Sequence, residues 1–295
     1  MRRLQVVVNP CAGGGRAARL LPRVETALRG AGHDLVVTRT VSLAHADELA
    51  AAAVADERVA VAMGGDGVVG RVAGVVADLG GVLGVLPGGR GNDFCRSVGL
   101  PQDPVAACAV LRDGQERAVD LGCAGDVAFL GIASVGFDST VQERVLSSRL
   151  PLGRLVYLYG ALATVATWRP ATFRCQVDGR AVVVRGWSVA VANSGMYGGG
   201  MRLAPDASVV DGRLDVVSTS ATSRTRFLRA LPKVFRGTHV HEPSVEVVRA
   251  RRVELTADRP FRVFADGDPV ADLPCTVTVR PGALRVLLPR RFGQR

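Results

Sequence analysis

The sequence predicts a two-domain protein in which an α/β domain with a mostly parallel sheet precedes an antiparallel β-sandwich. Three observations support this α/β plus β fold class. Strand-like and helix-like segments alternate over roughly the first third of the chain, glycine-rich turns follow several of these early strands, and short extended segments separated by turn residues come later. The chain has 295 residues, of which 48% are hydrophobic, so it has the length and core material for two domains.

The first domain is predicted to have three layers, with helices on both faces of the sheet. The apolar strands are expected at residues 4–8, 34–38, 58–62 and 81–86. The helices are expected at residues 17–29, 44–55 and 68–79, with further helical signal up to residue 111. Right-handed crossovers place the strand-to-helix turns of a parallel sheet along one edge, so the glycine-rich turns should lie together.

The second domain is predicted as an antiparallel sandwich with helices at 153–168 and 222–235. Its strands are expected at 119–122, at 127–135, and then as short runs separated by the turn signals Asp178-Gly179, Asp211-Gly212, Asp266-Gly267 and Pro281-Gly282. The predicted bounds of the parts are 1–123, 124–285 and a tail of 286–295 that returns to the first domain. A cleft between the two domains is the expected place for a functional site.

Three glycine-rich turns follow strands of the first domain. They are NPCAGGGR (9–16), GGDG (64–67) and PGGRGND (87–93). Glycine allows positive φ angles and close approach by another molecule, and the amides that begin the next helix point toward an anion. One such turn often serves only the packing of a helix on a strand, but three at one sheet edge favour a site for phosphate groups.

Asp66 places a carboxylate inside one of these turns. An aspartate beside phosphate would repel it unless a cation lay between them, so Asp66 predicts a Mg²⁺ ion. This combination indicates phosphoryl transfer, in which positioning and charge neutralisation provide most of the catalysis. The Walker sequence of P-loop enzymes is absent. Residues 13–18 match a dinucleotide fingerprint, but Arg39 lies where an acidic residue is expected, which weakens a dehydrogenase interpretation.

In order and spacing, these motifs resemble the catalytic domain of the diacylglycerol kinase family, which includes bacterial lipid kinases and sphingosine kinases. The opening N-P-x-x-G-x-G, the GGDG turn and P-x-G-x-x-N-D-F carry the resemblance in the first domain. In the second domain, residues 193–217 (NSGMYGGGMRLAPDASVVDGRLDVV) and 264–268 (FADGD) resemble the family's segments. The resemblance covers nearly the whole chain.

The resemblance implies an ATP- and Mg²⁺-dependent lipid kinase that binds ATP between the two domains and phosphorylates a lipid hydroxyl, with diacylglycerol as the leading acceptor. Asp266 matches the aspartate proposed to take the hydroxyl proton, and Asp66 matches the aspartate near the phosphates and Mg²⁺. These two are the catalytic candidates. The nucleotide-binding candidates are Asn9, Gly13, Arg16, Thr40, Gly64, Gly65, Gly67, Gly89, Arg90, Asn92 and Asp93.

A second Mg²⁺ is implied in the second domain as a structural brace. Asp211 matches the aspartate that holds this ion, and Ser208 and Arg213 match positions whose backbone carbonyls assist. Asp-Gly is also the commonest short turn signal. Without the resemblance, Asp211 and Asp266 would therefore be interpreted as hairpin turns.

Two other pairs of polar residues have structural interpretations. Asn92 and Asp93 are favoured helix N-cap residues, and we expect capping to be at least half of their role. His239 and His241 alternate on an extended stretch and could share a face, but no third ligand is nearby in the sequence, so a zinc site is not expected.

The sequence departs from the family pattern around the GGDG turn. The family usually has Thr directly after GGDG, where this chain has Val68. Two residues later the family has Asn-Glu, where this chain has Gly70 and Arg71. In the next glycine-rich turn Arg90 replaces a Thr, and in the FADGD segment Asp268 replaces a Glu. One hypothesis is that Arg90, with help from Arg71, replaces the lost hydroxyl contacts, because guanidinium donors suit phosphate. The alternatives are that Arg90 points to solvent, or that the enzyme has weakened activity.

The net charge of +10 favours an anionic partner, and we expect peripheral contact with an anionic membrane and no nucleic-acid partner. The helix at 153–168, with Arg149, Arg154 and Arg169 around it, is a candidate for lipid capture, with packing on the sandwich as the alternative. There is no bilayer-spanning segment, signal peptide or C-x-x-C pair, so we expect a cytoplasmic protein at the inner membrane surface. The oligomeric state stays open, with a homodimer as one option.

Two other functions also stay open. An NAD kinase would share the GGDG turn, although the FADGD turn and PGGRGNDF favour a lipid kinase. A non-catalytic nucleotide or lipid sensor on the same fold would also carry the glycine-rich turns. The presence of Asp66, Asp211 and Asp266 together favours an active enzyme, because a decayed one need not keep all three carboxylates.

Overall fold

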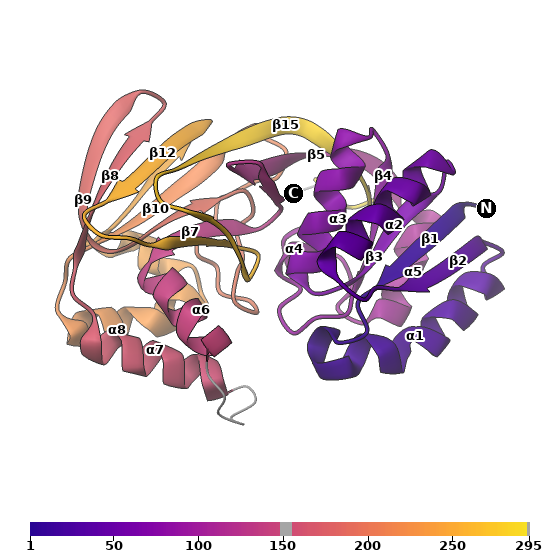
Figure 1. The fold of residues 1–295 in the computed structure, drawn as a ribbon, viewed down its shortest axis with the longest axis horizontal. Coiled ribbons are helices and arrows are strands. Elements are labelled where there is room, and N and C mark those ends of the chain that lie inside the picture. Colours follow the sequence, from indigo (N-terminus) through magenta and orange to yellow (C-terminus); the bar gives the residue numbers. More distant parts are fainter. Residues whose placement is uncertain (148–154, 294–295) are drawn as a thin grey trace.

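The computed structural model describes residues 1–147 and 155–293. An α/β domain that contains the amino terminus lies beside a second domain made mostly of strands, and two long strands connect them (Figure 1). The fold class predicted from the sequence is confirmed: a three-layer domain with a mostly parallel sheet is followed by an antiparallel, sandwich-like domain.

The central sheet of the first domain has parallel strands in the order β2-β1-β3-β4. These strands are β1 (Arg3–Val8), β2 (Asp34–Arg39), β3 (Val59–Gly64) and β4 (Val82–Pro87). Helices cover both faces of the sheet, so β1, β3 and β4 are buried on both sides. This explains why they read as continuous apolar runs and not as alternating patterns.

The helices of the first domain form the two outer layers. On one face lie α2 (Leu43–Ala55) and α3 (Asp66–Asp78), on the other lie α1 (Ala12–Gly30) and α5 (Pro104–Asp113), and the short α4 (Asp93–Ser97) follows β4. Buried alanine, valine and leucine side chains pack each pair of helices onto the sheet in a separate apolar cluster. The sheet is therefore held rigidly, with its strand-to-helix turns at one edge.

Two antiparallel strands run through both domains. β5 (Gln115–Ala124) pairs along its length with β15 (Cys275–Leu288), and β15 also pairs in parallel with β4 through Arg285 and Val286. The predicted turn at Pro281-Gly282 is wrong, because β15 continues through these residues with only a bulge in its pairing with β5. The last strand of the chain thus belongs to both domains.

The second domain consists of antiparallel strands. They are β6 (Val127–Phe129), β7 (Ile132–Gly136), β8 (Ala171–Val177), β9 (Arg180–Ala192), β10 (Leu214–Ser220), β11 (Val245–Ala250), β12 (Arg252–Ala257), β13 (Arg262–Ala265) and β14 (Asp268–Asp272). The order is β14-β13-β7-β9-β8-β12-β15, and β10 joins β9 to β11. The sequence did not predict β11, whose side chains are mostly exposed, or the short β14, which contains a proline.

Three helices lie at one end of the second domain (Figure 1): α6 (Phe137–Ser147), α7 (Leu155–Thr167) and α8 (Arg224–Val234). The sequence did not predict α6. Residues 153–154 of the helix predicted at 153–168 lie outside the described residues, as do Arg149 and Arg154. Within the described ranges, no helix has both the length and the apolar character needed to cross a bilayer.

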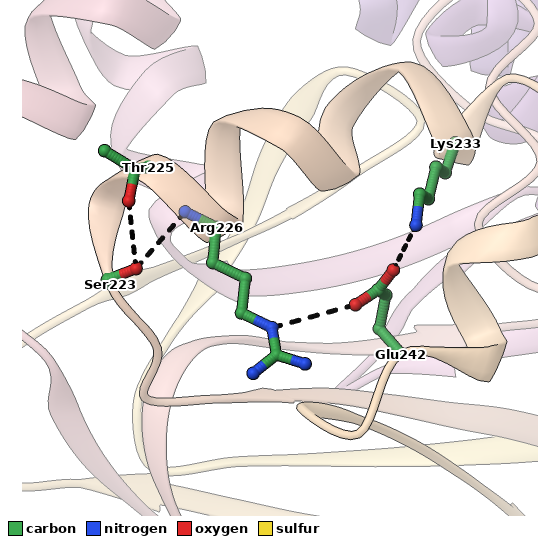
Figure 2. Close-up of polar contacts among 5 residues, drawn as sticks. All are labelled: Ser223, Thr225, Arg226, Lys233 and Glu242. Atoms are coloured by element: carbon green, nitrogen blue, oxygen red, sulfur yellow. Dashed lines mark hydrogen bonds and ion pairs between the residues drawn. The ribbon is translucent and has the colours of Figure 1, made fainter.

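Polar contacts fix α8 at both ends. Ser223 caps the helix by accepting a hydrogen bond from the amide of Arg226 (3.3 Å), and Glu242 forms ion pairs with Arg226 and Lys233 (Figure 2). Glu242 directly follows η1 (Thr238–His241), a 3-10 turn. The expectation that the two histidines of this segment lie on an extended stretch is therefore wrong.

Asp120 fastens the strands that connect the domains. Its buried carboxylate accepts hydrogen bonds from the amides of Gly212 (2.6 Å) and Gly282 (2.8 Å), which lie on a loop and at the bulge of β15. We predict that Asp120→Ala lowers the free energy of unfolding by about 2–4 kcal/mol, because two N–H groups lose their partner. Urea denaturation measures this change.

The control for this experiment is Asp126→Ala, which removes an exposed carboxylate near the end of the same strand. Its unfolding free energy should change by no more than about 0.5 kcal/mol. If Asp120→Ala were as stable as this control, the carboxylate of Asp120 would not be a structural fastener.

Candidate active site

The three glycine-rich turns pack against one another at the carboxyl ends of β1, β3 and β4. Gly13 has a φ of 63°, and a Cβ atom there would lie 2.5 Å from the carbonyl oxygen of Gly88. Only glycine allows this backbone conformation together with this contact. A Cβ on Gly65 would lie 3.6 Å from the Cα of Gly89. The prediction that these turns share one edge is confirmed.

Three of the predicted nucleotide contacts lie at this edge. The side-chain oxygen of Asn9 accepts from the amide of Cys11 (3.0 Å) and closes the first turn. Thr40 is buried, and its amide bonds to the end of β1. Arg16 donates to the carbonyl of Gln102 (3.1 Å), so part of its guanidinium is already used within the protein.

The predicted capping role of the Asn92-Asp93 pair is wrong. Asn92 has a left-handed backbone with φ of 51°, and its side chain accepts from the amide of Gly89 (2.8 Å) and donates to its carbonyl (3.2 Å). These bonds close the third glycine-rich turn. The amide of Phe94 in the first turn of α4 donates to Oδ1 of Asp66 (3.2 Å), so the first residue of α3 caps this turn.

Asp93 instead connects the two domains. Its carboxylate accepts from the amide of Gly199 in the second domain, with N···O distances of 2.9 and 3.1 Å. Gly198, Gly199 and Gly200 all have positive φ angles. The sequence analysis missed this contact, and its signal is the run of three glycines within the segment that resembles the family.

Asp66 and Asp93 lie close together. A Cβ on Gly91 would lie 3.0 Å from Oδ2 of Asp66 and 2.9 Å from Oδ2 of Asp93. Burial, reinforced by the charge of Asp93, raises the pKa of Asp66 to about 6, and burial also raises the pKa of Asp93. Two carboxylates in this position fit a hard divalent cation whose remaining ligands are phosphate and water oxygens.

Asp266 lies on the turn between β13 and β14, with a φ of 53°. Its carboxylate accepts from the amides of Leu130 (2.8 Å) and Gly131 (2.9 Å), and a Cβ on Gly70 of α3 would lie 2.9 Å from its Oδ2. Burial raises the pKa of Asp266 to about 7, against the lowering effect of these hydrogen bonds, and the charge of Asp66 also raises it. The second domain thus presents Asp266 to the GGDG helix of the first.

Asn193 holds the turn that binds Asp266. It is fully buried, and its Nδ2 donates to the carbonyls of Leu130 (3.0 Å) and Asp120 (3.1 Å). The bond to Leu130 orients the backbone whose amides face Asp266. In the sequence, Asn193 is visible only as the first residue of the segment 193–217, and its role could not be inferred from spacing.

A polar pair at the start of α6 was also missed. The hydroxyl of Tyr197, two residues before Gly199, lies 3.4 Å from Oδ1 of Asp138. Burial raises the pKa of Asp138 to about 6. Because α6 itself was not predicted, the sequence offered no reason to bring these two residues together.

Two departures from the family pattern have explanations in packing. Gly70 stands where the family has Asn, and its missing side chain leaves the space that the carboxylate of Asp266 approaches. Val68 stands where the family has Thr. Its side chain is only 5% exposed and belongs to the apolar cluster between α2, α3 and the sheet. The lost hydroxyl is thus replaced by core packing.

Arg71 and Arg90, the two arginines that depart from the family pattern, have different surroundings. Arg71 forms an ion pair with Asp47 of α2, so its charge is already partnered within the protein. Arg90 is exposed, and its Nη2 would lie 3.6 Å from a Cβ on Gly14, next to the first glycine-rich turn. Arg71 is thus less available for a phosphate group, whereas the exposed position of Arg90 fits both the phosphate contact and the solvent-facing alternative.

At the predicted structural metal site, the carboxylate of Asp211 has hydrogen-bond and ionic contacts within the protein. Asp211 accepts from the amide of Arg213 (3.0 Å), and the guanidinium of Arg249 lies 4.0 Å from Asp211 and 3.6 Å from Asp215. In residues 1–147 and 155–293, no three His, Cys, Asp or Glu side chains are grouped to hold a metal ion. Arg249 supplies one positive charge for both carboxylates, and Mg²⁺ at Asp211 with the backbone carbonyls of Ser208 and Arg213 stays a prediction.

Comparisons with known proteins agree with this geometry. Residues 3–124 match the family model described as the diacylglycerol kinase catalytic domain, and residues 131–288 match the YegS C-terminal NAD kinase beta sandwich-like domain. A solved diacylglycerol kinase from Bacillus anthracis str. Sterne has a TM-score of 0.77 at 21% identity, covering 99% of this chain and 98% of that one. A second solved chain from this organism has a TM-score of 0.80 at 23% identity, covering 98% of both. These structures establish the fold.

Curated relatives extend over the whole chain. The diacylglycerol kinase of Mycobacterium tuberculosis (strain ATCC 25618 / H37Rv) is 36% identical, covering 98% of this chain and 96% of its own length. The diacylglycerol kinase of Bacillus subtilis (strain 168) is 26% identical, covering 100% and 99%. A probable YegS-like lipid kinase of Pseudomonas fluorescens is 33% identical, covering 89% and 88%. The resemblance seen in the sequence is therefore confirmed: the chain belongs to the diacylglycerol kinase family and is a lipid kinase that transfers a phosphoryl group to an alcohol.

Proposed function

We propose that this lipid kinase transfers the γ-phosphoryl group of ATP, with Mg²⁺, to the hydroxyl of diacylglycerol and so forms phosphatidic acid. The observation that carries the proposal is the carboxylate of Asp266, which the second domain presents against α3 and near Asp66 of the first. A proton acceptor at this junction can face both a lipid on one domain and a nucleotide on the other. The names of the relatives with 36% and 26% identity support diacylglycerol as the acceptor.

The first domain would bind the nucleotide through its three glycine-rich turns. Backbone amides there would donate to the phosphates, and the guanidinium of Arg90 would add charged donors next to the first turn. Asp66 and Asp93 would hold Mg²⁺, which supplies neutralisation of the phosphate charge. Burial raises the pKa of both carboxylates because their charged forms are poorly solvated. A bound cation would stabilise these charged forms.

Asp266 would accept the proton of the acceptor hydroxyl. A pKa of about 7 allows its carboxylate to take up a proton near neutral pH. In a loose phosphoryl transfer the proton moves late, so the orientation of the hydroxyl matters more than its early deprotonation. The amides of Leu130 and Gly131, with Asn193 behind them, hold the carboxylate in one orientation.

We also propose that the protein meets its acceptor at the membrane face where ATP is present. Diacylglycerol resides in the bilayer, so phosphorylation needs at least transient peripheral contact. The net charge of +10 favours an anionic membrane surface, where each nearby basic side chain contributes about 1 kcal/mol.

Radiolabelled ATP, Mg²⁺ and vesicles that contain diacylglycerol test the proposed reaction. We predict that label appears in phosphatidic acid and that Asp266→Asn lowers the rate by about 100-fold or more, because the proton acceptor is lost. Asp126→Asn, which removes an exposed carboxylate, should keep the wild-type rate. Transfer of the label to NAD in a parallel incubation, or full activity of Asp266→Asn, would overturn the proposal.

Arg90 and Arg71 provide a matched pair for the nucleotide site. We predict that Arg90→Ala raises KM for ATP about tenfold, because a charged donor to phosphate is removed. Arg71→Gln should change this KM by less than about twofold, since its guanidinium is paired with Asp47. Steady-state kinetics with ATP as the varied substrate measures both. Equal KM values for the two variants would show that Arg90 does not contact the nucleotide.

Asp266 also makes the stability of the metal-free protein depend on pH. Its folded-state pKa is raised from 3.8 to about 7, so the folded protein retains a proton that the unfolded chain has lost. This stabilisation is complete below pH 3.8 and is lost as the pH rises through about 7. We predict that the unfolding free energy, measured in urea with EDTA, falls between pH 5 and pH 8, and that Asp266→Asn reduces the fall by roughly 2–3 kcal/mol.

The raised pKa values of Asp66 and Asp138 act in the same direction, so some of the fall should remain in Asp266→Asn. Asp126→Asn is again the control and should keep the full pH dependence. An Asp266→Asn protein with an unchanged pH dependence would mean that this carboxylate is ionised in the folded protein at pH 5.

A further inference from the structure

A cavity of about 420 Å³ lies in the second domain between α6, the end of α7 and the loop before β13. Its walls include Arg144, Thr167, Trp168, Arg169, Arg259 and Phe261. None of these residues belongs to the candidate active site. The cavity is therefore separate from the candidate active site.

Three arginines line this cavity, and among the described residues only Arg259 faces a carboxylate. Arg259 lies 3.9 Å from Oδ1 of Asp258. Arg144 and Arg169 have no acidic partner among the described residues, and the sequence of 148–154 (SRLPLGR) contains no acidic residue. Arginines gathered around one hollow give it a positive potential, which favours an anionic ligand.

Two of the guanidinium groups are held in place. Arg259 lies over the rings of Trp168 (5.3 Å) and Phe261 (5.0 Å) and donates to the carbonyl of Arg169 (2.5 Å). Arg144 donates to the hydroxyl of Thr167 (3.0 Å). Each guanidinium has five N–H donors, so several remain for a ligand. Oriented guanidinium groups around one cavity suit the oxygens of a phosphate group.

The basic surface of α8 is less suited to this role. Arg226 and Lys233 both face the carboxylate of Glu242, which partly neutralises them (Figure 2). Arg144 and Arg169 have no such neighbour among the described residues. Arg224, Arg229 and Arg236 of the same segment also have no acidic partner among the described residues, so what distinguishes the cavity is that its arginines line one hollow.

Exposed apolar side chains lie on the same helices. Leu146 of α6 is 63% exposed, Tyr159 and Leu162 of α7 are each 50% exposed, and Phe235 at the end of α8 is 58% exposed. These helices lie together at one end of the domain (Figure 1), and α7 and α8 share an apolar cluster. Apolar side chains beside basic ones are typical of protein surfaces that lie at a membrane interface.

We propose that this cavity binds a phosphate group, with Arg144 and Arg169 as its main ligands, and that an anionic phospholipid headgroup supplies it. A soluble phosphate compound offers the same chemistry, but the apolar side chains on α6, α7 and α8 favour the lipid. The proposal does not rest on the proposed reaction, because the cavity shares no residue with the active site.

Vesicle binding by the full-length protein, without ATP or diacylglycerol, tests this proposal. The vesicles contain phosphatidylcholine alone or an equimolar mixture with phosphatidylglycerol. We expect Arg144→Gln/Arg169→Gln to weaken binding to the mixed vesicles by about 10- to 30-fold. The control Arg23→Gln/Arg117→Gln removes the same charge from exposed arginines of the first domain and should weaken binding by no more than about threefold.

A charge-retaining variant and a titration with inorganic phosphate complete the experiment. Arg144→Lys/Arg169→Lys retains the charge and should recover most of the vesicle binding, which a misfolded protein would not. Titration with inorganic phosphate, followed through the tryptophan fluorescence to which Trp168 in the cavity wall contributes, detects a soluble ligand. A phosphate response that the Gln variant loses, with vesicle binding unchanged, would overturn the lipid source. Equal behaviour of the Gln variant and the first-domain control in both assays would overturn the site itself.

Discussion

The carboxylate of Asp266 lies half-buried where the two domains meet, and much of the surrounding structure serves to hold it there. Removing a charge from water is costly unless hydrogen bonds or counter-ions compensate for the loss. Two amides of the second domain provide the hydrogen bonds, and Asn193 orients the turn that carries them. On the other side, Gly70 leaves α3 without a side chain at the point of contact. The position of the Asp266 carboxylate therefore depends on contacts from both domains.

One acidic residue of the site, Asp93, takes part both in the acidic cluster and in the contact between the domains. Asp93 lies close to Asp66 on one side and accepts hydrogen bonds from Gly199 of the second domain on the other. A cation that binds to Asp66 would change the electrostatic environment of the same carboxylate that connects the domains. If the proposed cation binds there, nucleotide binding would be coupled to the position of the loop at 198–200 through Asp93.

The sequence predicted the features that depend on local patterns. Strands buried on both faces give apolar runs, and glycine-rich turns after them indicate one functional edge, so the first domain and Asp66 could be found. Features that depend on distant partners could not. The turn signal at Pro281-Gly282 is overridden by pairing with β5, and the capping tendency of Asp93 is overridden by Gly199, which is 106 residues away. Helix α6 was missed because its sequence, FDSTVQERVLS, has only a weak apolar face.

The course of β15 has a consequence for biosynthesis. Leu284, Val286 and Leu288 of this strand complete the apolar layer of the first domain, although they are made last. At typical translation rates the ribosome needs about 10–30 s to extend the chain from the end of β5 to the end of β15. During this time the edge of β4 has no partner strand, and an unpaired edge of this kind promotes association with other chains. Until β15 is made, the first domain therefore lacks part of its apolar layer and the second strand partner of β4.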